Sequence, residues 1–316
     1  AIICKICRAR THPIWGTPNT GTLTDMSPWD IWSLVSKLLV LVGASTVSGG
    51  TFSLYLSRDF GDDISGRMRR YIILGAMLGA VATMVTFLTQ LGAINQNGLR
   101  GMFDPQMAVI IGQSPLGYAT GTRFAGFTIA IAAMLMWQYR ERSRLYYLYV
   151  VFGLSALASL FFSFTMMGHI AELGILPRLS IVIHVAAALL WIGSLYPLWL
   201  LCNADVSSAK LKTVMEKFGR VAIYLVALLL TAGVYLLTQL LSSIDQLFST
   251  PYGQAMLIKL LAVVALLTLG ALNKFFLVSR LYVDTGRQSL ARSIGLEMVM
   301  ALGILAMTVH LTTNVG

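Results

Sequence analysis

The sequence has few charged residues. Asp, Glu, Lys and Arg make up 11% of its 316 residues, whereas hydrophobic residues make up 57%, and the mean hydropathy is +0.76. A soluble domain of this length cannot bury that much apolar surface. The composition therefore excludes a soluble globular protein and indicates a polytopic membrane protein.

Motifs for energy coupling and catalysis are also missing. The chain has no glycine-rich Gly-Lys phosphate loop, no Asp-Lys-Thr-Gly phosphorylation motif and no soluble stretch long enough to hold a nucleotide. No nucleophile, base and orienting group recur at a useful spacing, and three cysteines provide no disulfide framework. We therefore predict that the protein is not an enzyme and not a primary pump.

Long apolar runs are abundant, and eight of them approach the roughly 20 residues that cross a bilayer. Strand alternation is absent, and backbone groups in lipid must be satisfied internally, so we predict an all-α, polytopic membrane helical bundle. The expected spans are residues 31–56, 71–93, 122–139, 145–168, 178–201, 218–241, 254–278 and 293–312.

The positive charges predict the topology of these spans. The connections at 57–70, 139–144, 202–220 and 273–292 hold 4, 3, 4 and 4 Lys or Arg residues, 15 of the 23 in the chain. Short loops rich in Lys and Arg stay in the cytoplasm, and these four are the odd-numbered connections. We therefore expect both termini on the outer side, and we attribute the net charge of +10 to topology and not to nucleic-acid binding.

The chain divides into a polar tail, residues 1–28, and a membrane domain, residues 29–316. The tail carries the Cys-Lys-Ile-Cys motif at Cys4–Cys7 and three cations in its first ten residues. A single Cys-x-x-Cys is a weak metal or redox signal. An unstructured tail and a non-native stretch are the competing interpretations. Because Met26 directly precedes the first helix start, we favour a biological start there, with residues 1–25 non-native, over a metal-binding tail.

Two short motifs suggest an internal repeat. Ser114-Pro115-Leu116-Gly117, interpreted as a turn, is followed six residues later by Arg123, and Thr250-Pro251-Tyr252-Gly253 by Lys259. Both motifs precede inward-running spans, the third and the seventh. Spans one to four and five to eight are therefore predicted to be parallel repeats in a 4+4 arrangement.

Histidines in the spans, with neighbouring methionines, form the candidate binding site. The topology places all three span histidines near the outer surface, and Glu172 close to one of them. Neutral imidazole and thioether groups are suitable ligands for copper, and titratable groups in lipid are functional candidates by default. An interior or interfacial histidine without a ligand is the competing interpretation. The candidate ligands are His169, His184, His310, Met166, Met167 and Met307.

Several stretches resemble the CopD family of copper-resistance membrane proteins. They are GHIA at 168–171, IHVAAALLWIGSLYPL from Ile183, KFGRVA at 217–222, TPYGQAMLIKL at 250–260, LGALNK at 269–274 and RSIGLE at 292–297. The resemblance covers most of the chain from the first span to the last, and it implies an eight-helix bundle in the bacterial inner membrane that moves copper, thought to admit it from periplasm to cytoplasm.

The residues at positions of the family pattern are His169, His184, Lys259, Asn273, Arg292 and Glu297. His310 and Glu172 have no assigned position in it. We expect a structural or gating role for Lys259, Asn273, Arg292 and Glu297, and favour for Glu297 a lock with Arg220, Arg292 or another cation, since carboxylate oxygen suits Cu(I) poorly. The lone Cys202 is expected to be inert packing.

The expected substrate is copper, as Cu(I), and the expected partners are membrane lipid and a periplasmic copper chaperone; the sequence does not indicate the oligomeric state. A haem-binding membrane redox protein is the alternative function, because histidines on neighbouring helices can clamp one iron. A third alternative is a bundle that only scaffolds a complex.

Overall fold

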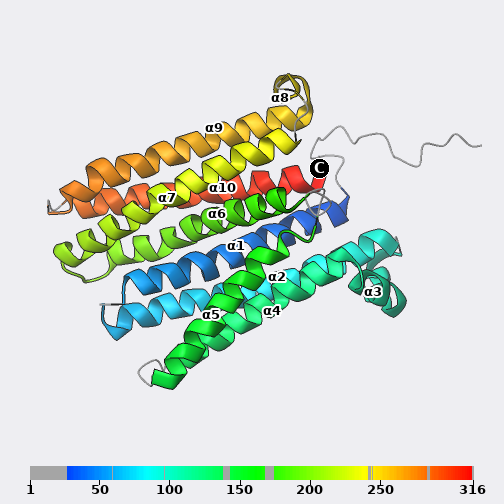
Figure 1. The fold of residues 1–316 in the computed structure, drawn as a ribbon, viewed down its shortest axis with the longest axis horizontal. Helices are drawn as coiled ribbons and strands as arrows, with labels where there is room; N and C mark the ends of the chain where they lie inside the picture. Colours follow the sequence, from blue (N-terminus) through cyan, green and yellow to red (C-terminus); the bar gives the residue numbers. More distant parts are fainter. Residues whose placement is uncertain are drawn as a thin grey trace, which may run out of the picture.

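The computed structural model describes residues 27–58, 60–95, 97–137, 143–167, 174–240, 243, 245–282 and 285–314. Within these ranges there is no strand, and eight helices are long and apolar enough to cross a membrane (Figure 1). The all-α polytopic prediction is confirmed. The eight are α1 (Pro28–Leu56), α2 (Asp62–Asn95), α4 (Pro115–Met136), α5 (Ser143–Ser163), α6 (Ile175–Asn203), α7 (Ser208–Leu240), α9 (Pro251–Leu272) and α10 (Gly286–Asn314).

The helices extend beyond several of the predicted spans. At their cationic ends, α2 begins at Asp62 instead of 71, α7 at Ser208 instead of 218, and α10 at Gly286 instead of 293. The apolar runs predicted only the part of each helix that lies in hydrocarbon. The added turns carry Lys and Arg residues, which belong at the water interface but continue the same helix.

The connection expected between residues 94 and 121 is itself helical. It contains η2 (Gly98–Phe103) and α3 (Pro105–Gly112). Asp104 caps α3 by accepting the N–H groups of Gln106 and Met107, at 2.9 and 3.2 Å, and the side-chain amide of Asn95 at 3.0 Å. These bonds hold the pKa of Asp104 below its ordinary value, with Met107 contributing most and Asn95 next.

The two repeated motifs are helix starts and not turns. Pro115 and Pro251 are the first residues of α4 and α9, where proline's missing N–H costs nothing. Thr250 accepts the N–H of Gly253 at 3.0 Å and so caps α9. Each motif thus opens the third span of its half, as the 4+4 prediction requires, while the repeat itself stays a prediction.

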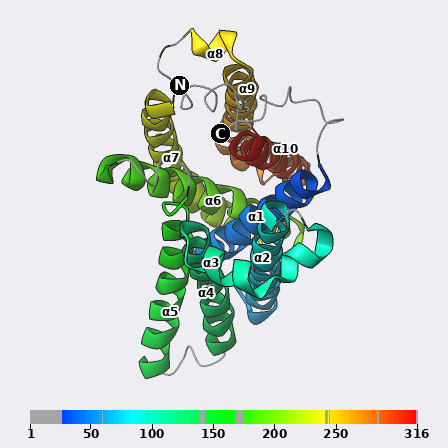
Figure 2. The same ribbon diagram turned by 90° about the vertical axis from the view of Figure 1, so that its right-hand side faces the viewer.

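Helices α1 and α6 cross at the centre of the bundle, with α4 and α5 on one side and α7 and α9 on the other (Figure 2). At the crossing, Gly49 meets Gly193 so closely that a Cβ on either would overlap the other helix's backbone. Ser194 donates to the carbonyl of Gly49 at 3.2 Å, and Tyr71 of α2 to that of Gly193 at 3.0 Å. The small residues at 43–50 thus allow a close helix approach.

The bundle has two chemically different ends. At one, here called the terminal end, α1 begins and α10 ends (Figure 1). At the other, the basic end, α2, α7 and α10 begin with their Lys- and Arg-bearing turns. There Arg287 of α10 donates to the carbonyls of Leu201, Cys202, Ala204 and Val206, four groups at the end of α6. The guanidinium therefore ties α10 to α6.

Candidate metal centre

His184 lies on α6, nine residues after the helix begins at Ile175. Its Nδ1 is 3.0 Å from the backbone carbonyl oxygen of Leu229 on α7. A carbonyl oxygen only accepts hydrogen bonds, so Nδ1 carries the proton and donates it. The lone pair of the imidazole is then on Nε2, which is the atom available to a metal ion.

A glycine on α7 makes room for this imidazole. A Cβ built on Gly233 would stand 3.0 Å from Cε1 and 3.1 Å from Nδ1 of His184. Both are shorter than the 3.5–4.0 Å of an ordinary carbon contact. Any larger residue at position 233 therefore displaces the ring.

Lys259 of α9 is the third member of this group. It is half-buried, and its charge acts on the imidazole of His184. Of the predicted residues, Lys259 on α9 thus acts on His184 on α6 through its charge. The contacts with α7, from Leu229 and Gly233, were not predicted, because one is a backbone group. Gly233, one of two glycines in the apolar run 218–241, was the sequence signal for a close approach.

Met166 and Met167 lie just beyond the end of α5, and both are half-buried. The hydroxyl of Thr122 on α4 donates to the sulfur of Met166 at 3.7 Å. The neighbouring Arg123 donates from Nε to Ser163 at 3.0 Å and lies 4.7 Å from the ring centre of Phe164. Met166 therefore belongs to a polar cluster between α4 and α5.

Met307 and His310 are three residues apart on α10, so they share a face of that helix, and both are half-buried. Three residues further on, Thr313 accepts a hydrogen bond from Lys37 of α1 at 3.0 Å. The partner of Lys37 is therefore a hydroxyl, and the charge of Arg123 also acts on it. The last turns of α10 are thus fixed to α1 at the terminal end.

His169 and Glu172 lie outside the described residues. Among the residues that the structure does describe, no three His, Cys, Asp or Glu side chains group closely enough to hold a metal ion. The predicted ligands that are described occur on separate helices: His184 on α6, Met166 and Met167 after α5, Met307 and His310 on α10. All belong to the terminal end.

Asn273 and Glu297 meet on the basic side of the bundle. Asn273 is the first residue of a π-helical turn, η5 (Asn273–Leu277), which follows α9 and leads to η6 (Val278–Arg280). Its side-chain Nδ2 donates to Oε1 of Glu297 on α10. Glu297 is 3% exposed and Asn273 7%.

Glu297 was expected to pair with an arginine, but its partner in the structure is Asn273. Arg220 and Arg292 are both exposed, and the amide of Asn273 takes their place. A π turn holds an extra residue, which changes the direction of the side chains that follow. Cys202 is buried, in keeping with the packing role expected for it.

Two family models match the chain. Residues 30–176 match the copper resistance protein D-like N-terminal domain, and residues 212–311 match copper resistance protein D. The chain belongs to the CopD family of copper resistance proteins. The first match spans α1 to α5 and the second spans most of α7 through α10. The resemblance inferred from the motifs is confirmed. No curated protein and no solved structure matched the chain.

Proposed function

We propose that this CopD-family protein carries Cu(I) across the bacterial inner membrane, from the periplasm to the cytoplasm, and that His184 is a ligand at the point of uptake. The observation that carries the proposal is the hydrogen bond from Nδ1 of His184 to the Leu229 carbonyl. Histidines that bind metals usually donate their second ring N–H to such a carbonyl or to a carboxylate, which fixes the tautomer and the ring orientation.

Thioethers and imidazoles from neighbouring segments complete the proposed site. His169, Met166, Met167, Met307 and His310 are the candidates, because they belong to the same end of the bundle and are neutral, soft ligands that suit Cu(I). Lys259 on α9, whose charge acts on His184, is assigned a gating role.

The charge distribution supports the orientation of the chain that this direction of transport requires. Because the basic connections stay in the cytoplasm, the terminal end faces the periplasm, and both termini lie there. Copper then meets His184 first and leaves at the basic end. The chain is a carrier and not an enzyme in this proposal, and a periplasmic copper chaperone delivers the ion.

Metal binding by the purified full chain tests the proposal. We expect His184→Ala to weaken the binding of Ag(I), a redox-stable substitute for Cu(I), by tenfold or more in a calorimetric titration, and Met166→Leu to weaken it less. Met84→Leu is the matched control, because Met84 is 43% exposed on α2. Unchanged binding by His184→Ala contradicts the proposal, and a Soret band in the purified protein would support the haem alternative.

In cells, the His184→Ala protein is expected to lower copper accumulation relative to the wild type. A bundle that only scaffolds a complex predicts equal accumulation in the two strains. The Met84→Leu strain controls for expression of a substituted protein.

A further inference from the structure

A cavity of about 240 Å³ lies among α6, α7, α10 and the end of α9, in the part of the bundle closer to the basic end. Most of its lining is apolar. Its polar side chains are Asn273, Lys274 and Glu297. At roughly 30 Å³ for each molecule of liquid water, a cavity of this size holds several waters.

One buried atom in this cavity wall lacks a partner. Nδ2 of Asn273 donates to Glu297, but Oδ1 of Asn273, buried in the protein, receives no hydrogen bond. Buried polar atoms are nearly always paired. The unpaired acceptor next to a carboxyl group therefore indicates that a hydrogen-bond donor is missing from this pair.

A proton on Glu297 supplies that donor. An ionised carboxylate only accepts hydrogen bonds, whereas a protonated carboxyl group has an O–H that donates. A carboxylic acid and a primary amide can form two complementary hydrogen bonds, one in each direction. Protonation of Glu297 thus provides what Oδ1 of Asn273 lacks.

The charged side chains near Asn273 and Glu297 bind to other groups, so Asn273 is the partner of the Glu297 carboxyl group. Lys274 lines the same cavity, but its Nζ donates to the Gly219 carbonyl at 2.7 Å and lies 5.6 Å from the ring centre of Phe275. Arg287 is engaged with the end of α6. Trp191 lines the cavity from α6 and carries no charge.

We propose that Glu297 and Asn273 form a proton-binding site in this cavity, and that its proton exchanges for Cu(I) passing to the basic end. When Cu(I) occupies the cavity, the O–H bond of Glu297 breaks and the proton leaves through water toward the terminal end, from which copper entered. The carboxylate then balances the single positive charge of copper. When copper leaves at the basic end, the carboxylate takes up one proton from that side.

The exchange rests on the proposed copper transport, whereas proton binding does not, so the two are tested separately. Infrared spectroscopy of the purified full chain tests proton binding without any metal. At neutral pH we expect the carbonyl stretch of a protonated carboxylic acid in the wild type, and its loss in Glu297→Gln. Glutamine keeps the volume and both hydrogen-bonding functions of the neutral acid, so this variant is expected to fold.

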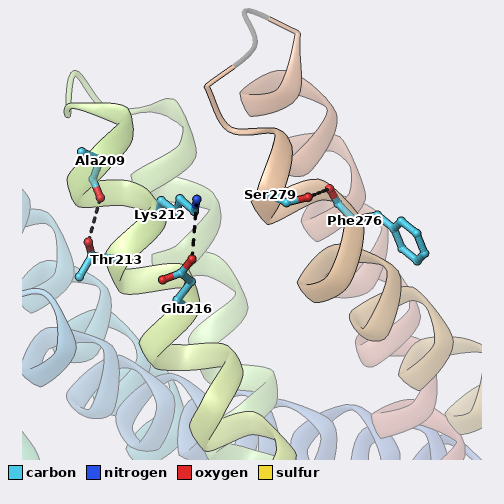
Figure 3. A network of polar contacts seen from close by, with 6 residues as sticks. All are labelled: Ala209, Lys212, Thr213, Glu216, Phe276 and Ser279. Carbon is cyan, nitrogen blue, oxygen red and sulfur yellow. Dashed lines mark hydrogen bonds and ion pairs between the residues drawn. The ribbon is translucent and has the colours of Figure 1, made fainter.

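Glu216→Gln is the matched control for that measurement. Glu216 is on α7 and forms an exposed pair with Lys212, at 3.9 Å, with its side chain 50% exposed (Figure 3). We expect the carboxylic-acid band to persist in Glu216→Gln and to shift in Asn273→Leu, which removes the amide partner. A wild type without the band, or a band that survives in Glu297→Gln, overturns the proton site.

Proteoliposomes with a pH-sensitive dye inside test the exchange. Wild-type protein and Glu216→Gln are expected to move one proton outward for each Ag(I) taken up, and Glu297→Gln none. Ag(I) uptake by the wild type without proton movement overturns the exchange and leaves the proposed transport standing. Absence of Ag(I) uptake in the wild type, with the infrared band still lost in Glu297→Gln, overturns the transport and the exchange but supports the proton site.

Discussion

The substitution Gly233→Val tests how the imidazole of His184 is held. Gly233 faces the ring across the α6–α7 contact, and the first carbon added there stands 3.0 Å from Cε1 and 3.1 Å from Nδ1. Restoring an ordinary carbon contact moves the ring by about 0.5–1 Å. The Nδ1 to Leu229 oxygen distance, now 3.0 Å, then reaches about 3.5 Å or more, at which the hydrogen bond is lost.

The expected effect is a loss of metal affinity without a loss of folding. Removing an outer partner of a metal-binding histidine typically weakens binding by about 10- to 100-fold, which is about 1.4–2.7 kcal/mol. Valine is not a poorer helix former than glycine, so the α7 helix itself is not weakened. The change in affinity therefore reports on the ring.

The assay is an Ag(I) titration of the purified full chain, with Gly303→Val as the control. Gly303 lies inside α10, and a Cβ there meets nothing within 4 Å. We expect near wild-type affinity and melting temperature for the control, and a folded protein for Gly233→Val. Wild-type affinity in Gly233→Val, or an equal loss in Gly303→Val, refutes the reasoning.

Two further predictions concern the ends of the bundle. Arg287→Gln should lower the free energy of unfolding by about 2–3 kcal/mol, because it removes charge-assisted bonds to the end of α6. Thermal unfolding in detergent measures this change. Arg280 is exposed, so Arg280→Gln is the control and should stay near the wild type. The pKa of Asp104 lies below its ordinary value of 3.8 in the folded protein. Its stabilisation of α3 is therefore complete above pH 3.8, and it is lost as the pH falls through the pKa of the folded state. Hydrogen exchange in residues 105–112 should therefore accelerate over that acid range in the wild type and show a weaker pH dependence in Asp104→Asn.

The sequence was sufficient for the number of membrane-spanning helices because each span must be apolar along most of its length. The small residues around Gly49 are a sequence signal of the same kind, because they permit the close approach to Gly193 of α6. Helix ends were predicted less well. The first turns of α2, α7 and α10 carry charges that hydropathy counts as loop, although their backbone bonds continue the helix.

The contacts of the candidate residues depend on backbone groups and on an irregular helical turn, which a sequence alone does not reveal. The partner of His184 is a backbone carbonyl, which every residue possesses and no motif marks. The partner of Glu297 was expected to be a cation, by the rule that charges in lipid are paired. In the structure, the partner of Glu297 is instead the side chain of Asn273 in the π turn. A Glu297 that carries a proton, as proposed above, needs no cation beside it.

The cationic side chains at the terminal end limit which metal ions can bind at the proposed site. Lys37, Arg123 and Lys259 are half-buried in α1, α4 and α9, and the charge of Lys259 acts on His184. The local field opposes any cation, so a bound ion must gain its stability from strong bonds to individual ligands. Imidazole and thioether provide such bonds to soft ions, whereas Mg²⁺ and Ca²⁺ need several oxygen ligands.

Two described carboxylates near this end already serve as helix caps. Asp30 accepts from the N–H and hydroxyl of Ser27 at 3.0 and 2.7 Å, and Asp104 caps α3. We therefore expect Ag(I) to displace bound Cu(I) from the purified chain at comparable concentrations, and a thousandfold excess of Mg²⁺ or Ca²⁺ to displace none. Displacement by Mg²⁺ or Ca²⁺ would mean that a carboxylate, with Glu172 the first candidate, takes part in binding. Glu172→Gln would then abolish that competition and leave the competition by Ag(I) unchanged.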